Sequence, residues 1–592
     1  MNNIYSKIDK AVEFFDTQTV NVIGDTDKGT GVYAFSQKQL LVDIDMAINS
    51  IYKGGNYDKQ GHRKLYLNKV RFYLSVANKN TDIDTGNLVL SPADYGDSNV
   101  WSVWFLNRQF RRWIKDEGFA SIINEAINDF NQYGSFVLKQ VGRDINRVPL
   151  RNLKNDQTSK TLMLGIQGGT PLIEEHNYSY MQMAEYKDTW TIGDYFEGKR
   201  KIYESYLYVS RKDYLETKKS LDEEYSEVNY SDDKSYDNDM IMVMCIYQPE
   251  SMDSKYKCGK KVLFIEEVKE IPYTECHDDK QDNRWIGRGE VEKQLENQLA
   301  SNLSVNLRLK SMKKASVDIY QTQGDSVAKN LITTVDDGEV LQVGLGGTIS
   351  RIDNTSRAQA DYTGNDQVWD DNSQKQAFSF ESATGEGFSS GTPFRLGAML
   401  SNSVMGYFDL KKEKIGLSLI DMFFSKLLTV FQKSAKDDLV AISQSEAGFN
   451  NIKNLFIEMY TGQNYADLAL NPKYFEMESV PTKEQIQQIV ELQLSKSPYL
   501  FIDVPKEIYK YAKANINFEI TGEGVSPGDS ESLTTLYTAM VQSGDPRATQ
   551  LLDVILASKG KNLAAIAGSS MPASPNMSQT AQNPDLQGLI SK

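Results

Sequence analysis

Residues 387–391 read Gly-Phe-Ser-Ser-Gly and match the G-x-S-x-G pattern of a nucleophile elbow, in which an activated serine attacks an ester or amide. Such an elbow needs a buried strand before the serine, a helix after it, and an acid and then a histidine later in the chain. No histidine follows residue 277, and the residues before 387 are polar and acidic. The pattern therefore favours a flexible Gly/Ser loop. A hydrolase built on Ser389 would need a histidine from earlier in the chain.

Metal-ligating side chains are few and poorly spaced for a metal site. The chain has three cysteines and three histidines, namely Cys245, Cys258, Cys276, His62, His176 and His277. No two cysteines stand as C-x-x-C, and the adjacent Cys276 and His277 would point to opposite faces of an extended segment. The glycine-containing segments 24–31 and 344–348 lack the G-x-x-x-x-G-K-[ST] spacing of a phosphate loop. We therefore expect no metal, no cofactor and no catalytic residue, and a protein that is not an enzyme.

The charge balance argues against tight binding of nucleic acid through neutralised phosphates. The 592 residues include 65 basic and 80 acidic side chains, which gives a formal net charge of −15 at pH 7. Proteins that grip DNA by neutralising its phosphates are basic, so any contact with DNA here should not hold it tightly. The sequence contains no run of about 18 apolar residues, and its amino terminus lacks the pattern of a signal peptide. We expect a protein that folds in the cytoplasm and has no membrane partner.

The first 285 residues divide into a helical part and a β-rich part. Leu, Ile, Val and Tyr recur at helical spacing within 36–134, and glycines close the last two helices there. Short apolar runs bounded by Gly, Pro, Asn and Asp predict strands over 135–280. Within that part, the acidic run 221–240 is expected to be a solvated loop.

One helix of the first part carries a basic and aromatic pattern. Arg108, Arg111 and Arg112 alternate with Phe110 and Trp113. This pattern fits a nucleic-acid patch, in which bases stack on the aromatic rings. The aromatic residues also recur at helical spacing, so we expect instead a packing face whose arginines are solvated.

The middle of the chain begins with a predicted helix over 286–315. Acidic side chains stand early in this helix and basic ones late, which opposes the helix dipole at both ends. Apolar side chains recur every four residues, at Val291, Leu295, Leu299, Leu303 and Leu307. We expect one apolar stripe that packs along a neighbour.

Three further segments follow this helix. Residues 316–358 predict a small insert of strands and a short helix, and 359–382 are acidic and lead into the Gly/Ser loop at 383–393. Residues 394–436 then predict one long helix without proline. Three glycines stand inside that helix, at Gly397, Gly406 and Gly416. Each glycine disfavours a helix relative to alanine, so they suggest close packing or a bend.

The carboxyl-terminal part is predicted to return to mixed structure. Residues 437–568 contain several further helical patterns and one strand pattern. Residues 569–592 are rich in Ser, Pro, Asn and Gln and are expected to be disordered unless a partner orders them.

This order of elements resembles the portal proteins of tailed double-stranded DNA bacteriophages. The resemblance rests on GRGEVEKQLENQLASN opening a stem helix, the small αβ insert in place of a clip, the acidic second stem segment, GEGFSSG in place of a tunnel loop, and the long helix after it. It implies an α+β fold that assembles as a ring. Its parts would be a wing at 1–285, stem segments at 286–315 and 359–382, a clip at 316–358, a tunnel loop at 383–393, a long bent helix at 394–436, a wing return and mainly helical crown at 437–568, and a polar tail at 569–592.

The resemblance also implies a function in the virion. A ring of subunits, usually twelve, would assemble in the host cytoplasm and stand at one capsid vertex, in contact with the major capsid protein and a scaffold. The terminase large subunit would drive double-stranded DNA inward through the ring, DNA would later be ejected through it, and head-to-tail adaptors or the tail would attach to it. Acidic residues along the channel would repel phosphates and let DNA slide.

Three groups of residues carry this implied function. The tunnel loop would consist of Gly385, Glu386, Gly387, Phe388, Ser389, Ser390 and Gly391. The acidic lining of the stem would consist of Asp366, Asp370, Asp371 and Glu381. The clip surface that contacts terminase or adaptors would consist of Gln321, Gln323, Asp325, Lys329 and Glu339. We expect Phe388 to pack against a neighbouring subunit or the channel wall. Another structural virion protein, such as an internal core or baseplate component, would share the acidic and cysteine-poor composition without closing a ring.

Overall fold

The computed structural model describes residues 4–23, 33–57, 59, 61–83, 88–93, 97–192, 195–221, 239–250, 258–315, 319–323, 348–352, 358–377, 394–434, 437–443, 449–450, 452–454, 456–458, 461–462, 482–497, 499–504, 506–510, 512–518 and 537. The chain has two compact units, one made of Met1–Thr85 and Val89–Asn517 and the other of Gly86–Leu88 and Phe518–Lys592. The second unit lies almost wholly outside the described residues. The fold is α+β with small sheets, as the sequence predicts.

The amino-terminal part is helical, with two short strand pairs. Its helices are α1 (Ile4–Thr17), α2 (Gln37–Ile48), α3 (Lys69–Thr81), α4 (Asp97–Asp116) and α5 (Phe119–Tyr133). β1 (Val20–Ile23) pairs with β2 (Tyr33–Phe35), and β3 (Leu88–Pro92) pairs with β16 (Ala514–Phe518). The prediction of a packing face on α4 is confirmed, because Phe105, Phe110 and Trp113 are buried.

The β-rich part forms two antiparallel sheets. The three-stranded sheet has the order β11 (Tyr273–His277), β4 (Ser135–Val141), β5 (Asp144–Val148). The five-stranded sheet has the order β10 (Lys261–Glu267), β9 (Met240–Gln248), β8 (Lys199–Ser210), β7 (Leu172–Ser179), β6 (Leu153–Lys154). The short helices α6 (Leu162–Gln167) and α7 (Tyr180–Ala184) flank β7, and α8 (Arg211–Leu221) follows β8.

Strand β9, which lies between β10 and β8, is apolar along nearly its whole length because both of its faces are covered. Val243, Cys245 and Tyr247 pack with residues of α1 and α8 on one face. Met242 packs in the main core on the other face, where residues of α2, α3, β4 and the start of the next long helix meet. A strand buried on both faces needs no polar alternation, which explains the run MIMVMCIY.

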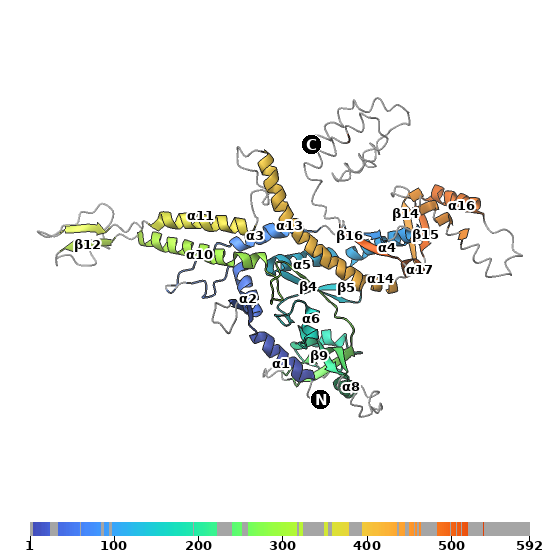
Figure 1. Ribbon diagram of the computed structural model, residues 1–592, viewed down its shortest axis with the longest axis horizontal. Coiled ribbons are helices and arrows are strands. Elements are labelled where there is room, and N and C mark those ends of the chain that lie inside the picture. The colour runs from blue at the N-terminus through green and yellow to red at the C-terminus, as the bar shows by residue number, and fades with distance from the viewer. Residues whose placement is uncertain are drawn as a thin grey trace. The chain divides into compact units, whose positions relative to one another are not determined.

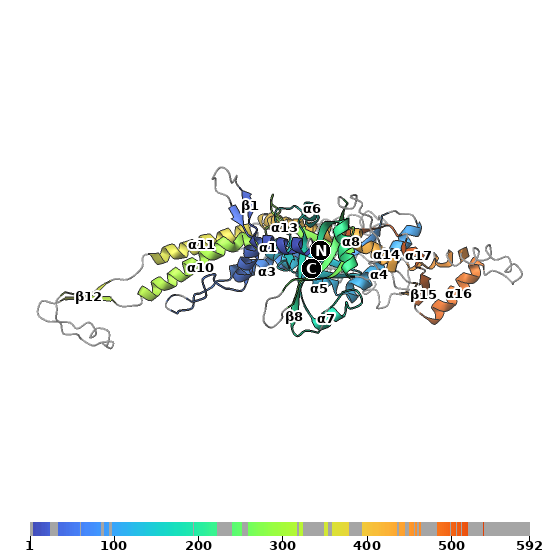
Figure 2. The ribbon, with the colours of Figure 1, turned by 90° about the horizontal axis from the view of Figure 1, so that it is seen from below.

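Two helices form an antiparallel pair that continues into a small strand pair. α10 (Glu290–Ala315) leads into β12 (Ile319–Gln323), and α11 (Ala358–Gln376) follows β13 (Thr348–Ile352). β12 and β13 pair antiparallel, with Ile319 opposite Ile352. Figures 1 and 2 show α10 and α11 side by side, with β12 beyond their far end. We call the α10/α11 pair the rod. The predicted helix at 286–315 and the strands at both ends of the insert are confirmed, while residues 324–347 lie outside the described residues.

The predicted long helix is present as one helical path from 394 to 434. It consists of α13 (Phe394–Met422), a π-helical turn at Phe423–Leu427 and α14 (Leu428–Ser434). The π turn inserts a local irregularity into the helix. At Gly406 an added Cβ atom would meet no atom within 4 Å, so close packing within this chain does not explain that glycine. Figure 1 shows α13 changing direction along its length.

The later part of the long helix packs one face against the rest of the protein. By length and composition, Met405–Lys433 is the one stretch among the described helices that is long and apolar enough to cross a membrane. Its side chains at Phe408, Ile415, Leu419 and Phe431 are buried within the protein. The remaining elements are β14 (Asp438–Ser443), α16 (Lys483–Lys496), β15 (Tyr499–Val504) and α17 (Glu507–Lys510), with β14 paired to β15.

Three glycines allow α5 and α10 to meet backbone to backbone. Gly134 ends α5 with a φ of 80°, in the left-handed region that glycine adopts without strain. Its carbonyl oxygen accepts a hydrogen bond from the Asp278 amide at 2.8 Å. A Cβ atom at Gly289 would lie 2.5 Å from the Gly134 nitrogen and 2.7 Å from the Gln132 carbonyl oxygen. No other residue type fits at this crossing, which we call the glycine crossing (Gly134, Gly287 and Gly289).

We predict that Gly289→Ala destabilises the fold by about 3 kcal/mol, because the added methyl group forces the two backbones apart. Gly259→Ala is the matched control, since a Cβ atom there meets nothing within 4 Å. Its stability should stay within about 0.5 kcal/mol of the wild type. The measurement is chemical denaturation followed by circular dichroism. Equal losses in the two variants would contradict the role of the crossing.

Candidate functional site

A buried cluster of charges lies beside the glycine crossing and joins the rod to the long helix. The Lys411 ammonium of α13 lies 2.6 Å from Glu290 Oε1, at the first residue of α10, and 2.9 Å from Asp278 Oδ2, after β11. The side chains of all three residues are less than 5 % exposed. Removing a charge from water is costly unless an opposite charge lies close to it. Lys411 provides that charge for both carboxylates, and it also donates a hydrogen bond to Glu290 Oε1.

Further groups complete this cluster. Lys293 lies 3.1 Å from Glu290 Oε1, Lys414 lies 3.2 Å from Asp278 Oδ1, and the Tyr407 hydroxyl donates to Glu290 Oε1 at 2.6 Å. Burial alone would raise the pKa of Glu290, but the Lys411 and Lys293 ammoniums outweigh burial and bring that pKa to about 2. Glu290 is therefore ionised at neutral pH. We call these residues, with Asp278 and Lys411, the junction cluster.

A Ser–His–Glu array stands on the other side of the glycine crossing. The Ser135 Oγ atom lies 2.8 Å from His277 Nδ1, and His277 Nε2 lies 3.2 Å from Glu275 Oε2. Burial lowers the pKa of His277, more than the hydrogen bond to Glu275 raises it. His277 is therefore neutral at pH 7, and the single proton of the Ser135 hydroxyl is donated to the Gly134 carbonyl oxygen at 2.7 Å.

This array differs from a hydrolytic site in its access. Ser135 is fully buried, and its Oγ atom also accepts a hydrogen bond from the Gly287 amide at 2.8 Å. A hollow of about 570 Å³ is lined by His277 and Glu275 but not by Ser135. Ser135 is thus shielded from solvent, and the array links the segments that meet at the glycine crossing. No local motif joins Ser135 to His277, because the two residues are 142 positions apart in the sequence.

A second group of ligand-type residues lies between β7 and β8. Oxygen or nitrogen atoms of Glu174, His176 and Glu204 lie within 4.8 Å of one another. The Lys139 ammonium is 2.8 Å from Glu174 and 2.5 Å from Glu204, so a cation of the protein already stands between the two carboxylates. Burial opposes ionisation of Glu204, yet the hydrogen bond from His176 and the charge of Lys139 bring its pKa to about 2. The E-x-H spacing of Glu174 and His176 on one strand face could have indicated this cluster.

The rod is held to residues 65–69, which lead into α3, by a ladder of side-chain amides, which we call the amide ladder. Gln298 accepts from the Lys69 amide at 2.8 Å, Asn302 from the Leu67 amide at 2.9 Å, and Asn306 from the Leu65 amide at 3.0 Å. Four residues of helix rise about 6 Å, and two residues of extended chain rise about 6.6 Å. The two spacings match. Every fourth side chain of α10 can therefore accept a hydrogen bond from every second backbone amide of residues 65–69.

Because the amide ladder faces inward, part of the predicted apolar stripe faces outward. Val291 is 1 % exposed and Leu295 packs against the core, but Leu299, Leu303 and Leu307 are 61 %, 62 % and 40 % exposed. Residues four apart advance about 40° around a helix, so the stripe winds from the core to the surface. Within this chain the predicted packing of the stripe is confirmed for Val291 and Leu295 alone.

Two residues of the predicted acidic stem lining form ion pairs with basic side chains. Asp366 forms an ion pair with Arg308 of α10 at 3.3 Å, and Asp370 forms one with Lys69 of α3. Asp371 is exposed and has no ion pair among the described residues. Glu381 lies outside the described residues.

The other predicted site residues are mostly outside the described part of the chain. These are the whole tunnel loop, Gly385, Glu386, Gly387, Phe388, Ser389, Ser390 and Gly391, and Asp325, Lys329 and Glu339 of the clip. Gln321 and Gln323 lie on β12, paired with Ser350 and Thr348. The acidic run at 221–240 lies outside the described residues between Leu221 and Asp239, as does the polar tail 569–592.

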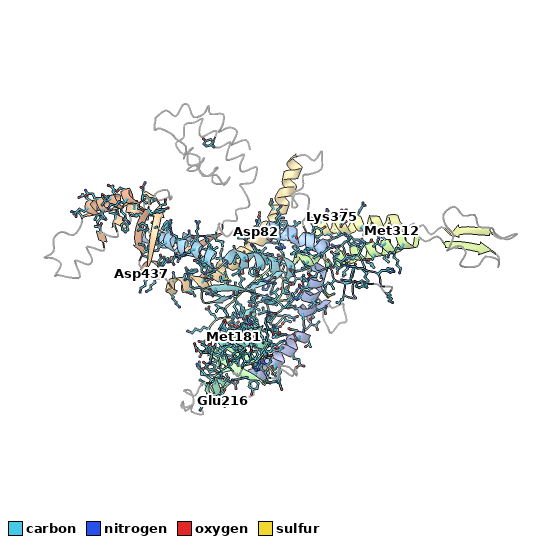
Figure 3. The ribbon with its side chains drawn as sticks, turned by 180° about the vertical axis from the view of Figure 1, so that it is seen from behind. Asp82, Met181, Glu216, Met312, Lys375 and Asp437 are labelled. Atoms are coloured by element: carbon cyan, nitrogen blue, oxygen red, sulfur yellow. The ribbon has the colours of Figure 1, made fainter. Side chains whose placement is uncertain are left out.

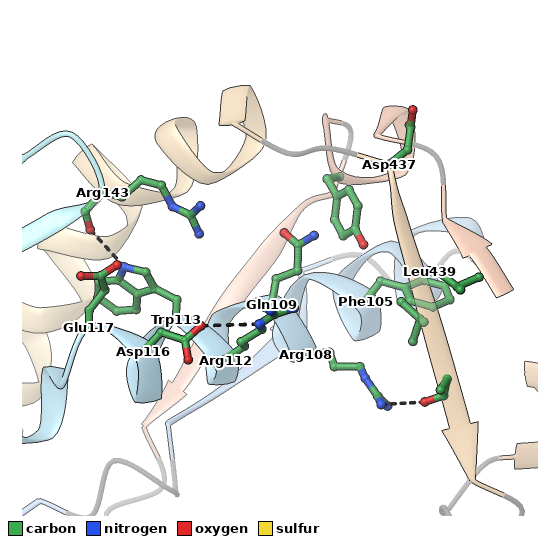
Figure 4. Close-up of a pocket in the computed structure, with 13 residues that line it drawn as sticks. Phe105, Arg108, Gln109, Arg112, Trp113, Asp116, Glu117, Arg143, Asp437 and Leu439 are labelled. Atoms are coloured by element: carbon green, nitrogen blue, oxygen red, sulfur yellow. Dashed lines mark hydrogen bonds and ion pairs between the residues drawn. The ribbon is translucent and has the colours of Figure 1, made fainter. Parts of the chain in front are cut away.

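A hollow of about 700 Å³ adjoins the arginine-bearing face of α4 (Figure 4). Arg108 donates to the Ala441 carbonyl oxygen of β14 at 2.7 Å, and Arg112 lies 3.5 Å from Asp116. Arg143 also lines the hollow. Three acidic residues, Asp116, Glu117 and Asp437, balance the three arginines. The arginines therefore create no net positive site for nucleic acid, in agreement with the expected packing face.

Comparison with known proteins adds no family. No protein-family model matches the chain. No curated protein matches it either.

We predict that Lys411→Met lowers the free energy of unfolding by about 3–5 kcal/mol, because two carboxylates then lose their buried cation. Lys412→Met is the matched control, since Lys412 lies one residue away and is only partly buried. It should change stability by about 0.5 kcal/mol or less. In the double variant Lys411→Met/Glu290→Gln the loss should be smaller than the sum of the two single losses, which denaturant titration would measure. Additive losses would contradict a direct interaction.

The junction cluster also predicts a pH dependence. The pKa of Glu290 is about 2 in the folded protein and 4.5 ordinarily, so its contribution to stability is complete above pH 4.5. That contribution is lost as pH falls from 4.5 toward 2, because the unfolded chain then binds the proton first. The difference in unfolding free energy between wild type and Glu290→Gln should shrink over this range. A difference that stays constant between pH 7 and pH 3 would show that Glu290 is not held ionised by the cluster.

Proposed function

We propose that this chain is the portal protein of a tailed double-stranded DNA bacteriophage. It would be a subunit of a ring-shaped channel at one capsid vertex, assembled in the host cytoplasm. The terminase would package DNA through this channel, DNA would later be ejected through it, and the tail or adaptors would attach to it. The chain would act by shape and charge, and would not be an enzyme.

One observation carries the proposal, namely the rod and the order of elements around it. α10 leaves the body at the junction cluster, β12 and β13 follow at its far end, and α11 returns beside it to the body. A helical path from 394 to 434 comes next and is tied to the base of the rod through Lys411. A stem, a distal clip and a long helix, in this order, are what the resemblance to portal proteins requires.

The anchoring of the rod supports a mechanical role. Its base is held by buried ion pairs, and its inner face is held by the amide ladder to residues 65–69. A rod fixed at its base can keep a channel wall in place while DNA moves past it. Its far end leaves β12 and β13, with Gln321 and Gln323, away from the body as the surface for terminase and adaptors.

Electrostatics support passage of DNA without tight binding. The formal charge of −15 per chain would repel phosphates and leave no deep binding minimum along a channel. Arg308 and Lys69 engage Asp366 and Asp370, so these four side chains are nearly neutral as pairs. The repulsion would therefore come from the protein as a whole.

Negative-stain electron microscopy of the purified protein, with mass from light scattering, tests this proposal. We predict rings of roughly twelve subunits, each of 66.9 kDa, with a central hole wide enough for duplex DNA. A chain that stays monomeric at all concentrations, or that forms only open or solid assemblies, would contradict the proposal.

A further inference from the structure

The exposed leucines of α10 cannot turn inward in this chain. Leu303 is 62 % exposed, and it lies nine residues from Gln294, or about two and a half helical turns. Gln294 faces α11, where it donates to the Ser373 carbonyl oxygen at 3.0 Å. Leu303 therefore points away from α11, and the amide ladder keeps α10 from rotating about its axis. We call Glu296, Leu299, Leu303 and Leu307 the outer face of α10.

α11 has a matching outer face on the opposite side of the rod. Gly364 lies nine residues from Ser373, again about two and a half turns, so it points away from α10. It is exposed, and a Cβ atom there would meet nothing within 4 Å. Glycine is unfavourable inside a helix, and nothing in the described part of this chain requires it at 364. With Val368, which is 55 % exposed, and with Asp371 and Lys375, it forms the outer face of α11.

The two outer faces carry complementary features at corresponding heights. Gln294 contacts Ser373 and Arg308 contacts Asp366, so Leu303 is level with the part of α11 that contains Val368. Glu296 and Lys375 both lie toward the body, and both are exposed without an ion pair among the described residues. Figure 3 shows Lys375 on α11 toward the body and Met312 on α10 toward the β12 end. One face thus offers a carboxylate and three leucines, and the other an ammonium, a carboxylate, a valine and a glycine.

We propose that the outer face of α10 in one subunit packs against the outer face of α11 in the next subunit. The inference rests on the proposed ring and names the surface that closes it. Subunits related by rotation about one axis keep corresponding heights, so leucines would meet Val368 and the Gly364 gap, and Glu296 would meet Lys375. Because the two faces differ and point in opposite directions, the contact repeats from copy to copy as a ring requires.

A second copy is favoured over another partner by this pairing within one sequence. Each chain presents both halves of the contact, with opposite charges at the same end of the rod. A leucine row needs a surface that approaches closely, and Gly364 leaves the space for it. Binding of an unrelated protein or a DNA duplex would explain why the leucines are exposed or why residue 364 is a glycine. It would not explain why the leucines of α10 and Gly364 of α11 lie at the same position along the rod.

Disulfide crosslinking between two single-cysteine variants tests the contact. Leu303→Cys and Val368→Cys would each be made in a Cys258→Ser background, since the remaining cysteines 245 and 276 are buried. After mixing during assembly and mild oxidation, we expect covalent dimers that neither variant forms alone. Leu303→Cys mixed with Met181→Cys is the control, because Met181 is 73 % exposed but lies away from the rod.

The outcomes separate this contact from the ring itself. Rings without covalent dimers in the Leu303/Val368 mixture would overturn the contact and leave the ring intact. Dimers in that mixture without closed rings would support the contact and contradict the portal function. Monomers with no crosslink at any concentration would overturn both.

Loss of assembly provides a second measurement. Leu303→Asn/Leu307→Asn should weaken association by roughly tenfold per leucine, because polar side chains replace the buried apolar contact. Ile489→Asn/Leu492→Asn removes two similarly exposed apolar side chains from α16 and should leave association unchanged. Light scattering over a dilution series would measure both. Unchanged association in the Leu303/Leu307 variant would overturn the proposal.

Discussion

The buried ammonium of Lys411 is the interaction on which the arrangement of this protein depends. It neutralises Glu290 at the base of α10 and Asp278 after β11, and it belongs to the long helix. Burying any one of these charges alone would cost several kcal/mol, so the three elements must meet together or not at all. The glycine crossing lies directly beside them and brings the end of α5 into contact with the start of α10. The direction of the rod relative to the β-rich part follows from these contacts.

The rod reverses the usual distribution of polar and apolar residues. Gln298 and Asn302 are buried because they satisfy the backbone of an extended segment, and the leucines on the other side are left in water. Exposed apolar rows of this kind mark interaction surfaces in soluble proteins. The single chain is thus incomplete along the rod. In the proposed ring, the next copy would supply the missing side.

Periodicity was sufficient to predict the helices at 286–315 and 394–436, the β-rich part and the burial of Trp113. It could not predict the junction cluster, because Lys411 and Glu290 are 121 positions apart and each looks like a solvated helix residue in its own segment. It also misplaced Leu299, because spacing by four drifts around the helix and the partner of α10 is a polar ladder. Likewise, the sequence indicates only turns at Gly134, Gly287 and Gly289. The structure shows that the backbone at Gly134 lies so close to the backbone at Gly287 and Gly289 that no side chain fits between them. The tunnel loop prediction lies outside the described residues and stays a prediction.

In the proposed ring, the rod would be the wall of a channel sized for DNA and would be anchored through Lys411. Electron cryomicroscopy of the assembled protein, at a resolution that traces helices, tests it most directly. We predict a closed ring in which α10 and α11 of every copy surround a bore that admits a duplex, with β12 and β13 at one end. An assembly in which the rods point away from any central opening would contradict it.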